Sequence, residues 1–398
     1  MSEQPPNPPK RGGATSSVHA GELRQQEANA ITTPIYQTST FWFENSEEVI
    51  EYQEGRKDRE EYGRYGNPTW NAVERKLSEL EGGEETVLFA SGMCAATTTF
   101  LSMLKPGSHL IVTSDCYRRT RQFINDYLGP MGVETTVIEP ASVAAFEAAI
   151  REESAAFFTE SPTNPYLRVI DVPETVELAH RHDIKVIIDS TFASPVNHRA
   201  LDDGADLVVH SATKYLGGHN DLLAGTITGP AELVDPIRKT LGVLGGIIDS
   251  HAAWLLLRGL KTLALRMQRH NENGLAVASW LEADSRIRQV WYPGLASHPD
   301  HETAAKLMSG FGGVVTFEIE TDLEGAMRFI DATRIPYQAP SLGGVESLIE
   351  LPVTMSYWDQ SPEQRAELGI TDSLVRLACG IEDAADLIED LDQALAQV

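Results

Sequence analysis

The 398-residue chain has few cysteines and no long hydrophobic run. Its three cysteines, Cys94, Cys116 and Cys379, are widely spaced and odd in number, and no Cys-x-x-Cys occurs. This pattern argues against a disulfide framework and against a cysteine-rich zinc site, and it favours a reducing compartment. No apolar stretch is long enough to cross a bilayer, and the N-terminal residues lack the apolar core of a secretory signal. We therefore expect a soluble, cytoplasmic protein with no membrane partner.

Basic residues are also scarce, because 32 Lys and Arg stand against 58 Asp and Glu, for a formal charge of −26. A surface with this charge repels the phosphates of nucleic acids and anionic lipids, so we expect neither as a partner. The first 17 residues contain four prolines and a pair of glycines, which predicts a disordered leader. With the irregular segment that follows, they form a predicted leader and N-terminal arm over residues 1–65.

Several common functional motifs are absent. The chain has no Gly-x-Gly-x-x-Gly, no Walker-type Gly-x4-Gly-Lys-Ser/Thr and no His-Glu-x-x-His. The pair His298 and His301 has metal-ligand spacing, but no acidic or cysteine partner stands at a matching position. We interpret this pair as part of a solvated helix face and expect no metal site.

The chain does contain a regular alternation of short apolar strands and amphipathic helices. Strands are predicted at 86–90, 109–113, 133–138, 155–160, 184–189 and 206–209, and helices at 70–80, 94–104, 120–128, 142–151 and 173–182. This alternation predicts an α/β fold with a mostly parallel sheet that helices cover on both faces.

A different pattern begins after about Ile247. One long helical run from Ser250 to about Glu282 precedes Val314–Glu320, whose clean alternation predicts a half-buried strand. We place an α/β domain at 66–254 and a smaller α+β domain at 255–398.

The stretch from His210 to Asp221 (HSATKYLGGHND) carries the most chemistry. Lys214 stands just past a predicted strand, and the small hydroxyl residues Ser211 and Thr213 precede it closely. Such hydroxyls are good phosphate ligands, and a lysine in an apolar cleft is kept partly neutral and nucleophilic. One interpretation is a lysine that carries pyridoxal phosphate as a Schiff base. The other is a surface lysine in a glycine-rich loop, and this stretch alone does not separate the two.

Two features elsewhere support the cofactor interpretation. Asp189 ends the preceding strand, and ligands of parallel sheets gather beyond the carboxyl ends of the strands. Ser91-Gly92-Met93 joins a strand directly to a helix, an arrangement that binds phosphate through backbone N–H groups and the helix dipole. An ordinary strand-to-helix turn has the same local pattern.

Taken together, eight motifs in register resemble the cystathionine γ-synthase family, the pyridoxal-phosphate enzymes of transsulfuration. They are Tyr62–Thr69 (YGRYGNPT), Ser91–Met93 (SGM), Asp115–Tyr117 (DCY), Glu160–Pro165 (ESPTNP), Asp189–Phe192 (DSTF), Ser211–His219 (SATKYLGGH), Ser341–Ser347 (SLGGVES) and Leu374–Leu377 (LVRL). The resemblance runs from Val18 to the end of the chain. It implies the aspartate aminotransferase-like fold (fold type I), with a seven-stranded sheet in the large domain. It also implies pyridoxal 5'-phosphate, amino-acid substrates and a homotetramer of active dimers.

The resemblance further implies roles for single residues. Lys214 would hold the cofactor and transfer protons, Asp189 would pair with the ring nitrogen, and Tyr117 would stack on the ring. The implied ligands of the cofactor phosphate are Gly92, Met93, Ser211 and Thr213, joined by Tyr62 and Arg64 of a neighbouring subunit. The implied catalytic residues are Lys214, Tyr117 and Tyr62. The substrate carboxylate would be bound by Arg376, with Asn164 and Ser341 as helpers.

The choice of reaction depends on a few charged residues. Glu346 and Glu61 match acidic positions of γ-specific and synthase-type members, and the alternative interpretation is that each is an exposed carboxylate without a role in the reaction. Basic residues after Tyr117, among them Arg119, resemble the plant-type enzymes, and methionine γ-lyases of the family have a cysteine where Arg119 stands. We expect an arginine here to favour a phosphate leaving group.

The predicted reaction is γ-replacement, in which an activated homoserine and cysteine give cystathionine. O-phosphohomoserine is the favoured donor. The O-acetyl and O-succinyl esters, and a physiological lyase acting on cystathionine or methionine, remain alternatives.

Overall fold

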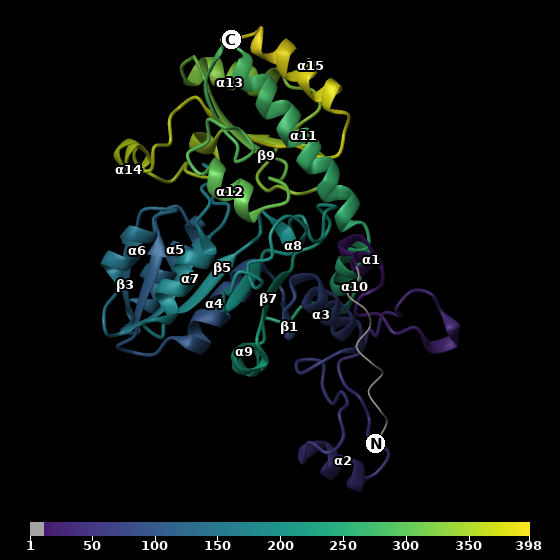
Figure 1. Ribbon diagram of the computed structural model, residues 1–398. Helices are drawn as coiled ribbons and strands as arrows, with labels where there is room; N and C mark the ends of the chain where they lie inside the picture. The colour runs from purple at the N-terminus through teal and green to yellow at the C-terminus, as the bar shows by residue number, and fades with distance from the viewer. Residues whose placement is uncertain (1–11) are drawn as a thin grey trace.

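The computed structural model describes residues 12–398, which form two β-sheets with helices around them (Figure 1). The larger sheet has seven strands in the order β1-β7-β6-β5-β4-β2-β3. These strands are β1 (Glu85–Phe89), β2 (His109–Thr113), β3 (Glu134–Ile138), β4 (Ser154–Glu160), β5 (Lys185–Asp189), β6 (Leu207–His210) and β7 (Gly225–Gly229). Strands β2 to β6 pair in parallel, and β7 is antiparallel to both of its neighbours.

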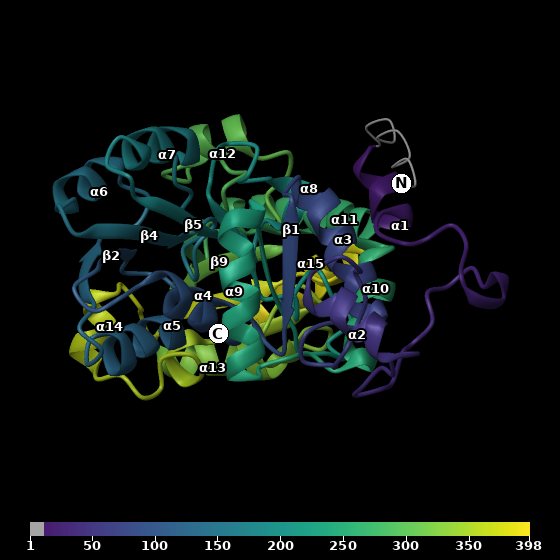
Figure 2. The same ribbon diagram turned by 90° about the horizontal axis from the view of Figure 1, so that it is seen from below.

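Helices cover both faces of this sheet, which explains why its central strands are apolar throughout. Figure 2 shows α6 (Val143–Ala149) and α7 (Val172–His180) on one face, with α4 (Gly92–Met103), α5 (Arg118–Phe123) and α9 (Ala231–Leu244) on the other. The fully buried pattern of β2 and β6 fits burial from both sides. The predicted α/β fold class with a mostly parallel seven-stranded sheet is confirmed.

A second, five-stranded sheet has the order β10-β11-β12-β9-β8. Its strands are β8 (Ile287–Trp291), β9 (Val314–Ile319), β10 (Tyr337–Gln338), β11 (Leu348–Glu350) and β12 (Leu374–Ala378), and the nearby helices are α11 (Leu263–Ala283), α12 (His301–Leu307), α13 (Leu323–Ala332), α14 (Pro362–Glu367) and α15 (Ala384–Leu395). This sheet lies in the upper part of Figure 1, above the larger one. The smaller second domain is therefore present, and a division at residue 254 remains our proposal.

The N-terminal part differs from the predicted disordered leader. Residues 1–11 lie outside the described part of the chain, but Gly13–His19 form helix α1. The fully buried ammonium group of Lys76 on α3 (Pro68–Glu81) donates to the carbonyl oxygens of Ser17 at 2.9 Å and Val18 at 3.1 Å. This contact fixes the end of α1 on the body of the protein, so the prediction of disorder is wrong for residues 13–17. Beyond α1, the arm carries helix α2 (Ser46–Gln53).

The long helical run predicted from Ser250 is two helices, α10 (Ser250–Leu260) and α11, separated at Lys261 and Thr262. The chain is held tightly here, because a Cβ on Gly259 would lie 2.3 Å from the carbonyl oxygen of Gly217. The buried guanidinium of Arg266 also donates to the Gly259 oxygen at 2.8 Å. These tertiary contacts end the first helix at a point that periodicity does not reveal.

Two further predictions are corrected by burial. Strand β9 is buried on both faces, not half-buried, because its polar residues are also enclosed and paired: Thr316 donates to the Pro165 oxygen, and Glu318 forms an ion pair with Arg288. His298 is only 3% exposed and its ring contacts the Tyr166 oxygen at 3.1 Å, so it is a structural histidine and not part of a solvated face. Within residues 12–398, no helix is long and apolar enough to cross a membrane, and no group of three or more His, Cys, Asp or Glu is arranged to hold a metal.

Candidate active site

The reactive lysine of the sequence analysis lies beyond the carboxyl ends of β4, β5 and β6. Lys214 follows β6, and its Nζ donates to the Ser341 hydroxyl at 2.6 Å. Burial and the nearby Arg376 guanidinium lower the pKa of Lys214 to about 8, while Glu350 acts in the opposite direction. The amine is therefore partly neutral near physiological pH, which a nucleophilic lysine requires.

Asp189 lies at the end of β5, and within residues 12–398 hydrogen bonds reach only one of its carboxylate oxygens. Oδ1 accepts from the backbone N of Thr191 at 3.0 Å and from its hydroxyl at 2.5 Å. Burial raises the pKa of Asp189, and the adjacent Glu160 carboxyl, in register on β4, has its own pKa raised by burial and by Asp189. A buried carboxylate in this state is stabilised by a cation, and a protonated ring nitrogen is a suitable one.

Helix α4 begins at the same edge of the sheet. The Ser91 hydroxyl caps it by accepting from the Cys94 backbone N at 3.1 Å, so the first N–H groups of the helix, at Gly92 and Met93, are available to an anion. A Cβ on Gly92 would lie 2.8 Å from the Ser211 Cβ, so only glycine permits this close approach of the two phosphate-binding segments. The turn therefore fits a phosphate held between α4 and Ser211.

Thr213 fits this role less directly than Ser211. Its hydroxyl donates to the Ala224 oxygen at 3.2 Å and accepts from the Ala224 backbone N at 3.0 Å. Both bonds fasten the lysine loop to the segment leading into β7. Contact with a phosphate would require the hydroxyl of Thr213 to exchange one of these bonds.

Tyr117 is positioned by the turn that leads into α5. Its ring is 48% exposed, while its backbone N donates to the buried Glu160 carboxyl. The backbone is thus anchored below the site and the ring remains accessible. This is the arrangement that a stacking aromatic needs.

Ser341 links Arg376 on β12 to Lys214, because it hydrogen-bonds to both side chains. Its Nη2 donates to the Ser341 oxygen at 2.9 Å, and its Nη1 to the Asn164 Oδ1 at 3.3 Å. Arg376 Nε is buried and has no hydrogen-bond partner in the described part of the chain, so one donor of the guanidinium is left for an incoming carboxylate. Ser341 itself has φ of +99°, an unusual conformation for a residue with a side chain.

Two residues of this site were missed by the sequence analysis. Glu350 is 1% exposed and pairs with Arg376 at 3.0 Å, directly across the β11–β12 register. Glu160 accepts from the Tyr117 backbone N and stands in register with Asp189 on the neighbouring strand. In the sequence, each of these residues is a glutamate in an otherwise apolar strand, which is a sign of a buried functional carboxylate. The partner of Glu350 becomes evident only from the pairing of the strands.

The remaining predicted residues lie apart from this cluster within one chain. Arg64 donates to the Gly242 oxygen at 2.5 Å, with its guanidinium over the Tyr62 ring, and Glu61 belongs to the same arm. Glu346 is exposed and accepts from Asn220 at 2.8 Å, beside the lysine loop. Arg119 is exposed and donates to Gln122 at 2.5 Å.

A parallel α/β sheet with a lysine beyond β6, a buried aspartate and a capped helix at one edge defines a pyridoxal-phosphate enzyme of fold type I. Comparison with known proteins agrees. Residues 14–396 match the family described as Cys/Met metabolism PLP-dependent enzyme, and the chain belongs to this family. Pyridoxal 5'-phosphate is therefore its cofactor.

The similar proteins point to transsulfuration. The chain is 51% identical to "Cystathionine gamma-synthase 1, chloroplastic" of Nicotiana tabacum and 50% identical to the protein of the same name in Arabidopsis thaliana. Both matches cover 96% of this chain, with 71% and 68% of the respective relatives. A crystal structure of metB from Corynebacterium glutamicum superimposes with a TM-score of 0.91 at 39% identity, over 97% of this chain and 98% of that one.

The expected cytoplasmic location is contradicted by these comparisons. Both plant relatives are named as chloroplastic proteins. The three cysteines are free thiols, as a reducing compartment requires, but a reducing environment does not single out the cytoplasm. Cysteine content was therefore too weak a basis for the compartment.

Proposed function

We propose that the protein is a γ-replacement enzyme that joins an activated L-homoserine to L-cysteine and forms L-cystathionine. The observation that carries the proposal is the chain of contacts from Lys214 through Ser341 to Arg376. It places a partly neutral amine beside a guanidinium with a spare donor, as the α-amino and α-carboxyl groups of one substrate require. The similarity to plant cystathionine γ-synthases supports the same reaction.

The residues divide the work as follows. Arg376 binds the substrate carboxylate, with Asn164 and Glu350 holding the guanidinium in position. Lys214, whose amine is partly neutral, is placed to remove and return protons at the substrate carbons. Pyridoxal phosphate, when bound, supplies an electron sink for the negative charge that develops at the α-carbon. Asp189 holds the proton of the ring nitrogen, and Tyr117 covers the ring.

Selection of the leaving group is assigned to Arg119. Of the two other arginines of this segment, Arg118 forms an ion pair with Asp359, and Arg121 donates to the Ser114 oxygen at 2.6 Å and lines a different cavity. Arg119 is exposed and its one bond is to a neutral amide. An exposed guanidinium without an ion pair in the described part of the chain suits a phosphate ester, so we propose O-phospho-L-homoserine as the donor.

The test is the value of kcat/KM for O-phospho-, O-acetyl- and O-succinylhomoserine with cysteine. We expect the phosphate ester to be preferred, and Arg119→Gln to lower its kcat/KM by about tenfold or more while changing the acetyl ester little. Arg151→Gln, on the exposed outer side of the large domain, is the matched control for loss of one positive charge. A clear preference of the wild type for an acyl ester would contradict the phosphate assignment.

The same assays separate synthesis from cleavage. A physiological lyase would release 2-oxobutanoate and ammonia from cystathionine or methionine without a thiol acceptor, at rates comparable with synthesis. We expect release to be slow compared with cystathionine formation. Equal rates would contradict the proposed direction.

We further propose that the active unit is an oligomer in which Tyr62 and Arg64 complete the phosphate site of a neighbouring chain, and that the oligomer is a homotetramer. In its own chain, Arg64 donates to the Gly242 oxygen, and Tyr62 lines a cavity together with Arg64 and residues 247–250. The arm holds these proposed phosphate ligands away from the Lys214 site of its own chain. This position is explained if they bind the cofactor phosphate of a neighbouring chain.

A further inference from the structure

A second cavity lies apart from the lysine cluster, between α5 and the segment around α14. Its volume is about 400 Å³, and the residues that line it are Val112, Arg118, Arg121, Gln122, Ile124, Asn125, Asp126, Val137, Gln360, Gln364 and Leu368. Lys214, Asp189 and Arg376 are not among these lining residues. This cavity is thus not the cleft that holds the cofactor.

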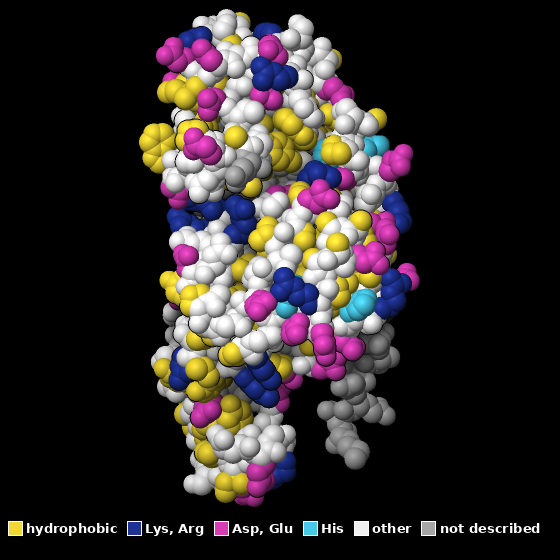
Figure 3. Space-filling model, turned by 90° about the vertical axis from the view of Figure 1, so that its left-hand side faces the viewer, with side chains coloured by type: hydrophobic (Ala, Val, Ile, Leu, Met, Phe, Trp, Pro, Cys, Tyr) yellow, Lys and Arg dark blue, Asp and Glu magenta, His cyan; other side chains and the backbone are white. Residues whose placement is uncertain are grey.

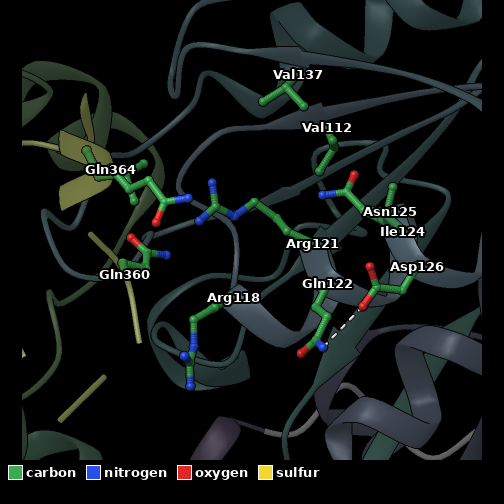
Figure 4. Close-up of a pocket in the computed structure, with 11 residues that line it drawn as sticks. Val112, Arg118, Arg121, Gln122, Ile124, Asn125, Asp126, Val137, Gln360 and Gln364 are labelled. Carbon is green, nitrogen blue, oxygen red and sulfur yellow. Dashed lines mark hydrogen bonds between the residues drawn. The ribbon is translucent and has the colours of Figure 1, made fainter. Parts of the chain in front are cut away.

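The cavity contains one unused donor and one unused acceptor. Arg121 Nε and Gln360 Oε1 are both buried, and neither has a hydrogen-bond partner among the residues that the structure describes. Figure 4 shows Arg121 of α5 reaching across the cavity toward Gln360 and Gln364, which come from the C-terminal domain. Buried polar atoms are rarely left unpaired in folded proteins, so the pair indicates a bound molecule that supplies an acceptor and a donor.

The charges around the cavity are arranged for a small polar ligand. Figure 3 shows a hollow on this side of the molecule with Lys and Arg side chains at its edge. Arg118 is neutralised by Asp359, while Arg121 has only the neutral Ser114 oxygen as a partner. In this partly enclosed space the guanidinium forms no ion pair within residues 12–398, and its nearby charge opposes the rise in the pKa of the buried Glu160 carboxyl. It suits a carboxylate.

The rest of the lining is apolar or acidic. Val112, Ile124, Val137 and Leu368 provide hydrocarbon surface, and the Asp126 carboxylate, which accepts from Gln122 at 3.2 Å, provides an acidic group. The volume of the cavity is larger than that of an inorganic anion and lies in the range of sites that bind small molecules. A carboxylate, an ammonium group and a short hydrocarbon chain match its three kinds of surface.

We propose that this cavity is a binding site for a free aliphatic α-amino acid, separate from the active site. The ligand carboxylate lies on Arg121, its ammonium group donates to Gln360 Oε1, and its side chain packs on the apolar residues. The site joins the two domains, and it includes α5, whose first turn follows Tyr117. Occupancy would therefore hold the start of α5 against the C-terminal domain.

The test is calorimetric titration of the holoenzyme after borohydride reduction, which fixes the cofactor on Lys214 and prevents reaction with added amino acids. The probe is L-leucine, and 4-methylpentanoate has the same skeleton without the ammonium group. We expect leucine to bind at one site per chain and 4-methylpentanoate to bind about tenfold more weakly or not at all.

Two variants and one control locate the binding. Arg121→Met removes the guanidinium, and Val137→Trp fills the cavity from a half-exposed position without removing any polar group. Each should weaken leucine binding by about tenfold or more, while Arg151→Gln, outside the cavity, changes it by less than about twofold. The cofactor absorbance and thermal unfolding of each variant report on folding, and Val137→Trp keeps the test valid if Arg121→Met folds poorly.

Three results would overturn the proposal. They are the absence of leucine binding to the wild type, leucine binding that Val137→Trp does not weaken, and binding of inorganic phosphate in place of leucine with the same dependence on Arg121. The second would place leucine at the active site, and the third would make the cavity an inorganic-anion site.

Discussion

The chemistry of Lys214 is set by the groups within reach of its amine. Burial and Arg376 disfavour the ammonium form, and Glu350 favours it. The Ser341 hydroxyl holds the amine in place by a single hydrogen bond. The same Glu350 neutralises Arg376, so one buried carboxylate influences both the nucleophile and the substrate-binding arginine.

The lowered pKa of Lys214, about 8, gives a pH dependence for cofactor binding. Only the neutral amine attaches to the cofactor aldehyde, so the rate of reconstitution of the apoenzyme should rise with pH through about 8 and then level off. Stopped-flow absorbance near about 420 nm measures the rate. The control is the reaction of pyridoxal phosphate with free Nα-acetyllysine, whose amine has a pKa of about 10.4. Any pH dependence that comes from titration of the cofactor itself appears in this reaction as well. A protein rate that keeps rising with the control above pH 9.5 would contradict the shift.

Removal of Glu350 should destabilise the protein, because it leaves Arg376 buried without its counter-charge. We expect Glu350→Ala to lower the free energy of unfolding by about 3 kcal/mol. The midpoint of the reconstitution profile should also move to lower pH, since Glu350 raises the pKa of Lys214. Ser356→Ala is the matched control: it removes a neutral donor to the same carboxylate, at a cost of about 1 kcal/mol. Urea unfolding of both apoenzymes gives the comparison, and equal losses would contradict the charge argument.

At the scale of elements, hydrophobic periodicity located most helices and strands of the large domain. It worked there because each strand is short, apolar and followed by an amphipathic helix, as for β4 and α7. It failed where a tertiary contact decides the outcome. The break between α10 and α11 depends on the packing of Gly259 against Gly217, and the burial of β9 depends on partners for Thr316 and Glu318. Neither contact has a local signal.

The start of α4 offers a test at this scale. Gly92→Ala places a Cβ 2.8 Å from the Ser211 Cβ and 2.9 Å from its Cα, so the lysine loop must move away from the helix. We expect cofactor affinity to fall by about tenfold or more, because the two segments that cradle the phosphate separate. Equilibrium binding of pyridoxal phosphate to the apoenzyme measures this.

Gly13→Ala in α1 is the matched control, because nothing lies within 4 Å of its Cβ position. It should leave cofactor affinity unchanged. If Gly92→Ala also left the affinity for pyridoxal phosphate unchanged, the result would contradict the assignment of this turn to the phosphate site.

At the scale of the whole molecule, the candidate site was only partly predictable. The lysine, aspartate and arginine belong to recognisable motifs, and the fold brings them to one edge of the sheet. The backbone of Ser341, with its positive φ, links Lys214 to Arg376, and the pairing of β11 with β12 sets Glu350 against Arg376. Such contacts between distant segments do not appear in a single sequence.

The arm of residues 1–65 is a second feature of the whole molecule. Where it is described, it exposes large apolar side chains, including Ile31 at 95% and Trp42 at 77%. Arg64 and Tyr62 lie on this arm, away from the Lys214 of the same chain. Exposed apolar surface beside a displaced phosphate ligand is consistent with a partner chain that both covers the arm and receives the ligand.

Mixing two inactive variants tests this arrangement directly. Lys214→Ala removes the amine and Arg64→Ala removes the ligand proposed to act in the neighbouring chain. In a hybrid pair, one site receives both defects and the other receives neither. Dissociation and reassociation of an equal mixture should therefore restore up to about a quarter of wild-type activity.

The control pairs Lys214→Ala with Arg376→Ala, whose side chains meet within one chain through Ser341. Each hybrid site then carries one defect, and no activity should return. No recovery in the first mixture, once hybrids are confirmed by native mass spectrometry, would show that Arg64 acts within its own chain. Recovery in the control would contradict the placement of Lys214 and Arg376 of one chain in the same site.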